Sequence, residues 1–151
     1  MKKEKILLLT PLKHLSKLLE MNLQNYHIEA GNRESIANIS KKILYGNIDY
    51  VLMTGKINPK SNAFDGYYLF KTLVKLRLEY DKNIPKAVLL LSNRMDKNVF
   101  FYPFIVPIST LENIEKLIKD LKNVDINDKL YEHINKLPSI FSPFSILPYH
   151  R

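Results

Sequence analysis

The sequence predicts an α/β protein, built as a doubly wound three-layer sandwich around a five-stranded parallel sheet. Five short apolar runs recur along the chain, and segments with helical spacing of leucine and isoleucine separate most of them. These runs are apolar throughout, which is typical of strands that crossover helices bury on both faces. The length of 151 residues fits one domain.

The first half of the chain alternates strand and helix. Residues 6–9 predict the first strand, and residues 12–23 predict a helix. The apolar side of that helix consists of Leu12, Leu15, Leu18, Leu19 and Leu23. Residues 26–30 predict the second strand. Asn32 then predicts the N-cap of a second helix, which ends at Gly46.

The second half continues this alternation. Residues 50–53 predict the third strand, and residues 67–80 a helix after a loop rich in glycine, proline and asparagine. The residues that this helix is expected to bury are Leu69, Leu73, Leu76 and Tyr80. Residues 87–91 and 104–106 predict the fourth and fifth strands. A capping box that starts at Ser109 then predicts the next helix.

The crossover between the fourth and fifth strands is short. After Ser92, residues 93–103 are the only chain left for it, and a parallel crossover with its helix needs at least about 10–12 residues, so a full helix does not fit there beside its two turns. We therefore expect one helical turn or an extended connection there, which leaves part of the sheet uncovered.

Residues 124–151 form an extension to the domain of residues 1–123. Asn127 predicts the cap of a short helix, with Ile126 and Tyr131 placed for a hydrophobic staple. A proline-rich tail follows, whose large apolar residues are Ile140, Phe141, Phe144, Ile146, Leu147 and Tyr149. We expect this tail to cover the gap in its own molecule or in a neighbour, which makes these residues candidates for an interaction surface.

Composition excludes several classes of protein. No apolar run approaches the ~20 residues of a membrane span, and the apolar run near the start is too short for a signal peptide. There are no cysteines, so disulfides and thiolate sites are excluded, and we expect a cytoplasmic protein. The net charge of +8 is spread over mixed-sign helix faces, so we expect solvated lysines rather than a nucleic-acid interface.

The order of short motifs resembles a response-regulator receiver domain. Residues 5–9 resemble its first strand, and residues 29–35 its second strand and the following turn. Residues 49–53, followed by Pro59 and then by Asp65-Gly66, resemble the third strand, the proline loop and the start of the third helix. The fourth and fifth strands match at residues 84–92 and 104–107, so that the resemblance spans residues 5–122.

The resemblance implies that the phosphorylation chemistry of receivers is lost. A receiver uses an acid pair for Mg²⁺, an aspartate that accepts phosphate and a lysine that neutralises it. These positions fall on Thr10-Pro11, on Thr54 or Gly55, and on Val106. Only Ser92, the hydroxyl residue after strand four, matches. We therefore expect a pseudo-receiver with no catalytic residues and no cofactor.

The rim at the carboxyl ends of the strands remains a candidate ligand site, because ligands of open α/β sheets bind there. Its polar residues are Thr10, Thr54, Gly55, Lys56 and Ser92. They either hold an anion or cap the ends of strands and helices. No histidine has metal-ligand spacing with a carboxylate, so no metal is expected, and His14 and Asp65 are interpreted as a solvated side chain and a helix cap.

Three functions follow as hypotheses. The leading one is a non-enzymatic, receiver-like signalling module that binds another protein, or a second copy of itself, without aspartyl phosphorylation. The alternative is a sensor that binds a small molecule or a nucleotide at the crevice formed by that rim. The third and weakest is nucleic-acid binding through the basic helix faces.

Overall fold

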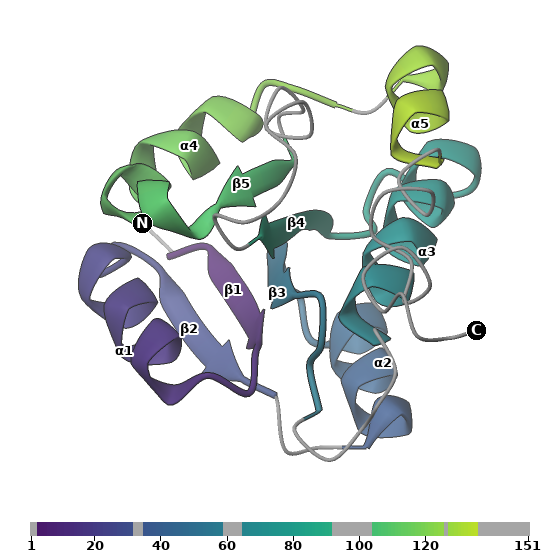
Figure 1. Cartoon of the computed structure of the whole chain (residues 1–151). Coiled ribbons are helices and arrows are strands. Elements are labelled where there is room, and N and C mark those ends of the chain that lie inside the picture. Colours follow the sequence, from purple (N-terminus) through teal and green to yellow (C-terminus); the bar gives the residue numbers. More distant parts are fainter. Residues whose placement is uncertain (1–2, 32–34, 59–64, 92–103, 126, 136–151) are drawn as a thin grey trace, which may run out of the picture.

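The computed structural model describes residues 3–31, 35–58, 65–91, 104–125 and 127–135 (Figure 1). Its elements are β1 (Lys5–Leu9), α1 (Lys13–Asn22), β2 (His27–Ala30), α2 (Ile36–Tyr45), β3 (Tyr50–Thr54), α3 (Asp65–Glu79), β4 (Lys86–Leu91), β5 (Ile105–Pro107), the 3₁₀ helix η2 (Ile108–Asn113), α4 (Ile114–Leu121) and α5 (Asp128–Asn135). No helix within the described ranges is long and apolar enough to cross a lipid bilayer.

The five strands form one sheet in the order β2-β1-β3-β4-β5, and every neighbouring pair is parallel. Leu8 of β1 pairs with Ala30 on one side and with Leu52 on the other. Leu89 of β4 pairs with Ile105 of β5. This order reverses direction between β1 and β3, which confirms the predicted doubly wound, flavodoxin-like sheet.

Helices cover both faces of the sheet (Figure 1). α1, η2 and α4 lie together on one face, and α2 and α3 lie on the other. α5 packs against α3. All residues of β3 and β4 are buried, as are four of the five residues of β1. The continuous apolar runs of the sequence are therefore the central layer, as strands covered on both faces must be.

α1 confirms the prediction of a helix but buries only part of the predicted apolar side. Leu15, Leu19 and Leu23 are buried, whereas Leu12 is 51% exposed and Leu18 is 39% exposed. The prediction that Leu12 and Leu18 belong to the core is therefore wrong. Five leucines span more of the helix circumference than the sheet and η2 cover, so leucines at the margin remain at the surface.

α3 buries a stripe that agrees with the predicted one only in part. It begins at Asp65, and Tyr80, just beyond its end, is 76% exposed instead of buried. The buried residues are Gly66, Tyr67, Phe70, Leu73 and Val74. Leu73 is therefore buried as predicted, and Leu69 packs half-buried against the core. Leucine spacing missed Tyr67, Phe70 and Val74, because α3 is apolar around much of its circumference and the spacing of one residue type does not select the whole stripe that packs.

The start of α2 differs from the prediction, and its end agrees with it. Its N-cap is Ser35, whose side-chain oxygen accepts the backbone N–H of Asn38 at 3.2 Å. The predicted cap, Asn32, lies outside the described residues, and the prediction was wrong by three positions. The helix ends at Gly46 as predicted, and the next residue, Asn47, has a positive φ of 55°.

The capping box predicted a helix that begins at Ser109. Instead, η2 runs through this position, and α4 begins only at Ile114. The apolar residues explain the difference. Ile108, Leu111 and Ile114 recur every three residues, which matches a 3₁₀ helix, and from Ile114 onward the spacing changes to that of an α-helix.

The C-terminal helix is confirmed. α5 follows Asn127, whose carbonyl oxygen accepts the backbone N–H of Tyr131 at 2.9 Å. Three predictions lie outside the described residues: the short connection at residues 93–103, the staple residue Ile126, and the proline-rich tail.

Candidate functional site

Thr10, directly after β1, and Thr54, the last residue of β3, are hydrogen-bonded to each other. The Thr54 hydroxyl hydrogen-bonds with the Thr10 hydroxyl, with 3.0 Å between the two oxygens, and with the carbonyl oxygen of Lys56 at 2.8 Å. Thr10 Oγ1 accepts the backbone N–H of Leu12 at 3.2 Å. Both threonines are buried, and Gly55 and Lys56 beside them are half-buried. The two hydroxyls therefore hold the strand ends and the first turn, as caps do.

The start of α3 lies directly against the end of β3. A Cβ on Gly66 would be 1.9 Å from the carbonyl oxygen of Thr54, so only glycine fits. Asp65 Oδ1 accepts the backbone N–H of Gly66 at 2.9 Å and that of Ile57 at 2.8 Å. Asp65, the first residue of α3, therefore satisfies one N–H at the start of the helix and also holds the loop after β3 in place.

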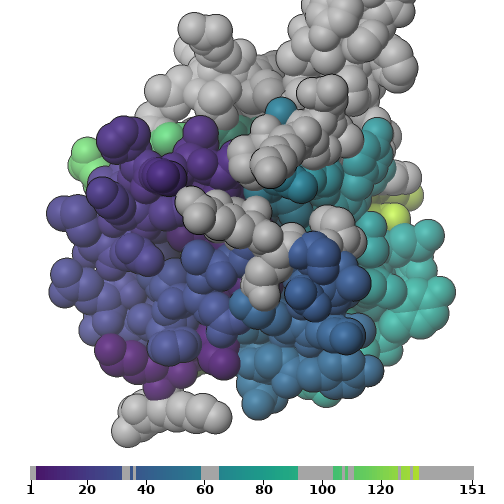
Figure 2. All heavy atoms as spheres, turned by 90° about the horizontal axis from the view of Figure 1, so that it is seen from below, coloured from purple at the N-terminus to yellow at the C-terminus, as the bar shows by residue number. Residues whose placement is uncertain are grey.

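The crevice brings together Thr10, Thr54, Gly55 and Lys56, whereas Ser92 lies outside the described residues. The side of the molecule where the first strands end is seen in Figure 2, framed by α1 in purple, α2 in blue and α3 in teal. Within the described part of the chain, no three histidine, aspartate or glutamate side chains gather as metal ligands would. The tail residues of the candidate interaction surface also lie outside the described residues.

An apolar groove lies between the start of α1 and η2. Its volume is about 450 Å³, and Pro11, Leu12, Lys13, His14, Leu15, Leu18 and Ile108 line it. The exposed residues Leu12 and Leu18 contribute much of its surface. His14 is exposed on the wall of this groove. The lining of this groove suits the binding of apolar side chains rather than a catalysed reaction.

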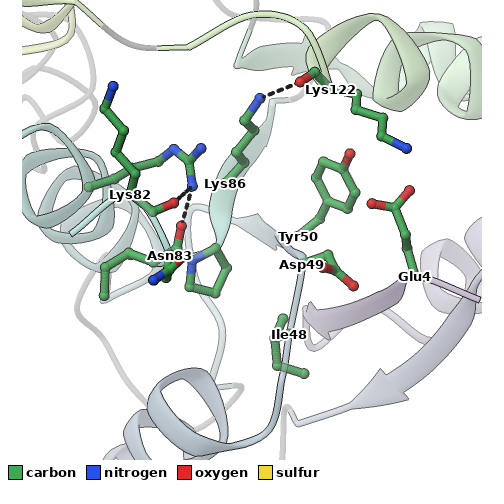
Figure 3. Close-up of a pocket in the computed structure, with 11 residues that line it drawn as sticks. Glu4, Ile48, Asp49, Tyr50, Lys82, Asn83, Lys86 and Lys122 are labelled. Atoms are coloured by element: carbon green, nitrogen blue, oxygen red, sulfur yellow. Dashed lines mark hydrogen bonds between the residues drawn. The ribbon is translucent and has the colours of Figure 1, made fainter.

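A polar pocket opens at the opposite end of the sheet, where β3 and β4 begin (Figure 3). We call it the amino-edge pocket. Its volume is about 260 Å³, and it is lined by Glu4, Ile48, Asp49, Tyr50, Arg77, Lys82, Asn83, Ile84, Pro85, Lys86 and Lys122. Four of these side chains are cationic and two are acidic.

Lys86 opens β4 and is nearly buried, with 9% of its surface exposed. Its Nζ donates to the carbonyl oxygens of Leu121, of Lys122 at 3.1 Å and of Val124 at 2.6 Å (Figure 3 shows one of these bonds). Burial lowers the pKa of this ammonium, and the charge of Arg77 lowers it further. The side chain caps the end of α4 and uses all three of its protons to do so.

Arg77 of α3 secures the other side of the same connection. Its Nε donates to Asp125 Oδ1 at 2.9 Å, and its Nη1 donates to the carbonyl oxygens of Lys82 at 2.6 Å and Ile84 at 2.5 Å. Lys86 and Arg77 together fasten the segment between α4 and α5 to the body of the sheet. Most of the hydrogen-bond donors of these two side chains are therefore used within the protein.

Tyr50 differs from these two residues. It is 3% exposed, and its ring meets Tyr26 edge-on with centroids 6.4 Å apart. Its hydroxyl points into the amino-edge pocket, toward the region between Lys122 and Glu4 (Figure 3). This hydroxyl makes no hydrogen bond to a described residue, and it is open to the solvent in the pocket rather than enclosed. Burial, and to a smaller degree the charge of Glu4, raises the pKa of Tyr50 to about 12.

Sequence reasoning missed the amino-edge pocket, because it considered only the carboxyl ends of the strands. One signal was available. Lys86 stands directly before the most apolar run of the chain, where a lysine must either be buried with partners or reach a solvent-filled space. Tyr50 and Lys122 carry no comparable local signal.

No protein-family model matches this chain, and no curated protein sequence matches it.

Proposed function

We propose that this protein is a non-catalytic, receiver-like signalling module that binds another protein and does not depend on aspartyl phosphorylation. The hydrogen bond between Thr10 and Thr54 carries this proposal. In the receiver pattern these positions hold a magnesium ligand and the phosphate-accepting aspartate. Two buried hydroxyls that bond to each other supply neither, so this edge of the sheet supports packing rather than phosphoryl transfer.

The groove between α1 and η2 is the surface that we assign to the partner. Leu12 and Leu18 are exposed there although they are large and apolar. Lys13 on the wall of the groove and Lys17 on the same helix are exposed cations. The chemistry that fits is a partner segment with apolar side chains flanked by acidic residues, because it would complement both the groove and its charged margin.

A charge placed in the groove tests this assignment. Leu18→Glu puts a carboxylate among the lining residues, whereas the control Met21→Glu makes the same change on α1 at an exposed residue outside the groove. Proteins captured from extracts of the native cell are compared for the wild type and both variants. A partner that Met21→Glu retains and Leu18→Glu loses supports the proposal. A partner set that is equal in all three contradicts it.

The alternative function, a small-molecule or nucleotide sensor at the crevice, requires Thr10 and Thr54 to turn toward a ligand. Their mutual hydrogen bond opposes this. We expect no nucleotide to raise the melting temperature of the wild type. A nucleotide that stabilises the wild type but not Thr54→Val, which removes the hydroxyl and keeps the shape, would favour the sensor instead.

A further inference from the structure

The outer side of β2 is a sheet edge with unpaired backbone groups. β2 lies at the end of the strand order and pairs only with β1 (Figure 1). The N–H groups of His27 and Gly31 donate to carbonyl oxygens on the β1 side, at 2.9 and 3.1 Å. Because backbone groups alternate in direction along a strand, the N–H and C=O groups of Ile28 and Ala30 point away from the sheet. Within the described ranges nothing hydrogen-bonds to them.

This edge lacks the features that usually protect edge strands. Lysine, proline and β-bulges are common in such strands, because each opposes pairing with another chain. β2 has the sequence His-Ile-Glu-Ala and a continuous register with β1, so it has none of the three. At the opposite edge, the carbonyl oxygen of Phe104 bonds to β4, which gives Pro107 an outward-facing position where it offers no N–H. Only the short length of β2 limits pairing on its side.

The side chains of β2 complement a second copy of the same strand. His27 and Glu29 lie on the face covered by α2, since Glu29 Oε2 is 2.7 Å from Lys42 Nζ of that helix, and Ile28 lies on the other face. In an antiparallel pair centred on Ile28, each His27 is directly opposite a Glu29 of the other copy. The exposed imidazole can donate to this carboxylate in either charge state. Such cross-strand pairs stabilise a sheet.

Charge selects this register over the neighbouring ones. A shift by two positions also brings outward-facing backbone groups together, so two other registers compete. One of them places Glu29 opposite Glu29 of the other copy, where the like charges repel. The other places His27 opposite His27 and leaves each Glu29 beyond the end of the other strand. Only the register centred on Ile28 gives each carboxylate a donor.

We propose that two copies of this protein associate through β2, antiparallel and centred on Ile28, so that one sheet continues across both copies. The N–H of Ile28 in each copy donates to the Ile28 carbonyl oxygen of the other, and the N–H of Ala30 donates to that of Tyr26. A twofold axis makes the same edge serve both copies. Pairing of so short a strand buries little surface, so we expect a transient dimer with a dissociation constant of roughly 100 µM. This interface is separate from the groove and from the crevice.

Sedimentation equilibrium of the full chain, from about 10 µM to about 1 mM, tests the association at an ionic strength that screens the repulsion between two basic chains. His27→Glu sets carboxylates opposite each other at both symmetric contacts, and should weaken the dimer at least about tenfold. His27→Lys places a permanent cation opposite Glu29 and should tighten the dimer a few-fold. The control Thr72→Glu adds the same charge at an exposed site on α3, and should dimerise as the wild type does.

Amide hydrogen exchange locates the interface independently of the variants. With rising concentration the amides of Ile28 and Ala30 should become protected, whereas those of His27 and Glu29 face β1 and should be protected throughout. A wild type that stays monomeric at about 1 mM overturns the proposal. A dimer with unchanged exchange at Ile28 and Ala30 also overturns it, as does a His27→Glu dimer as tight as that of the wild type. An equal loss in Thr72→Glu and His27→Glu would assign the effect to net charge and overturn it too.

Discussion

Hydroxyl groups have different surroundings at the two edges of the sheet. At the carboxyl edge, Thr10 and Thr54 satisfy each other 3.0 Å apart. At the amino edge, the hydroxyl of Tyr50, on the same strand as Thr54, makes no hydrogen bond to a described residue and opens into a pocket lined by four cationic and two acidic side chains. The threonine pair stabilises the fold directly, whereas a hydroxyl that is open to solvent can hydrogen-bond to water.

Phosphoryl donors should leave the protein unmodified. Thr10, Pro11, Thr54 and Val106 offer neither a magnesium ligand nor an acceptor carboxylate. After incubation with acetyl phosphate and Mg²⁺, we expect an unchanged intact mass. A gain of one phosphoryl group that hydroxylamine removes would contradict the proposed phosphorylation-independent role.

Gly66→Ala should destabilise the protein strongly. The new methyl group would lie 1.9 Å from the Thr54 carbonyl oxygen and 2.9 Å from the Ile57 side chain, so the start of α3 must move. We expect a loss of about 2–4 kcal/mol in the free energy of unfolding, measured by urea denaturation. Lys75→Ala, an exposed change on the same helix, should cost less than about 0.5 kcal/mol. Equal urea midpoints for the two variants would show that stability does not depend on the close approach of Gly66 to the Thr54 carbonyl oxygen.

Whole elements are connected by a few polar contacts between side chains that are distant in sequence. Arg77 on α3 and Lys86 on β4 both donate hydrogen bonds to the segment that joins α4 to α5. Lys42 on α2 meets Glu29 on β2, with Nζ 2.7 Å from Oε2. Such contacts set how a helix is placed on the sheet after apolar burial has brought the two together.

The contact between Glu29 and Lys42 predicts a defined pH dependence. The hydrogen bond from Lys42 lowers the pKa of the Glu29 carboxyl below its ordinary value of 4.5. The charged carboxylate therefore stabilises the fold above that value, and the contribution is lost as the pH falls through the lower, folded pKa. Because both side chains are about a third exposed, the amount is only about 0.5 kcal/mol.

Denaturant unfolding at two pH values measures this contribution. Glu29→Gln should be less stable than the wild type by about 0.5 kcal/mol near pH ~6, and the difference should vanish near pH ~3. The exposed Glu20 on α1 makes no ion pair within the described ranges, so Glu20→Gln is the control and should match the wild type at both values. A Glu29→Gln difference that persists in acid would assign the effect to packing instead.

At the scale of the whole molecule, the net charge of +8 is distributed over several elements. The amino-edge pocket gathers four cationic side chains at one end of the sheet, and the apolar groove lies on the face covered by α1 and η2. The two sites therefore draw on different elements, and one can be altered without changing the other.

Nucleic acid should bind only through general charge attraction. We expect duplexes of unrelated sequence to bind with equal affinity in fluorescence anisotropy, and the affinity to fall steeply as salt rises toward about 150 mM. Selective binding of one sequence that survives physiological salt would refute the proposed protein-binding role. A short single-stranded competitor of the same charge is the control for general attraction.

Local signals predicted much of the fold and little of the amino-edge pocket. The apolar runs at β1, β3 and β4 are long enough to identify buried strands, and Gly46 marks the end of α2, because these features depend on neighbours in the chain. Sequence order also predicted that Thr10 and Thr54 lie together, since adjacent parallel strands end at the same edge. Their hydrogen bond to each other, rather than to a ligand, was left open.

The sequence by itself determined the five strands, the parallel doubly wound sheet and the absence of receiver carboxylates at the crevice, because local apolar spacing and residue identity carry this information. Only the tertiary structure decided which flank of α1 stays exposed, where η2 gives way to α4, and that Tyr50, Lys86 and Lys122 share one pocket. The physical reason is that these outcomes depend on contacts between elements far apart in the chain. Such contacts form only when the sheet has assembled and each helix has found the stripe that buries the most apolar surface.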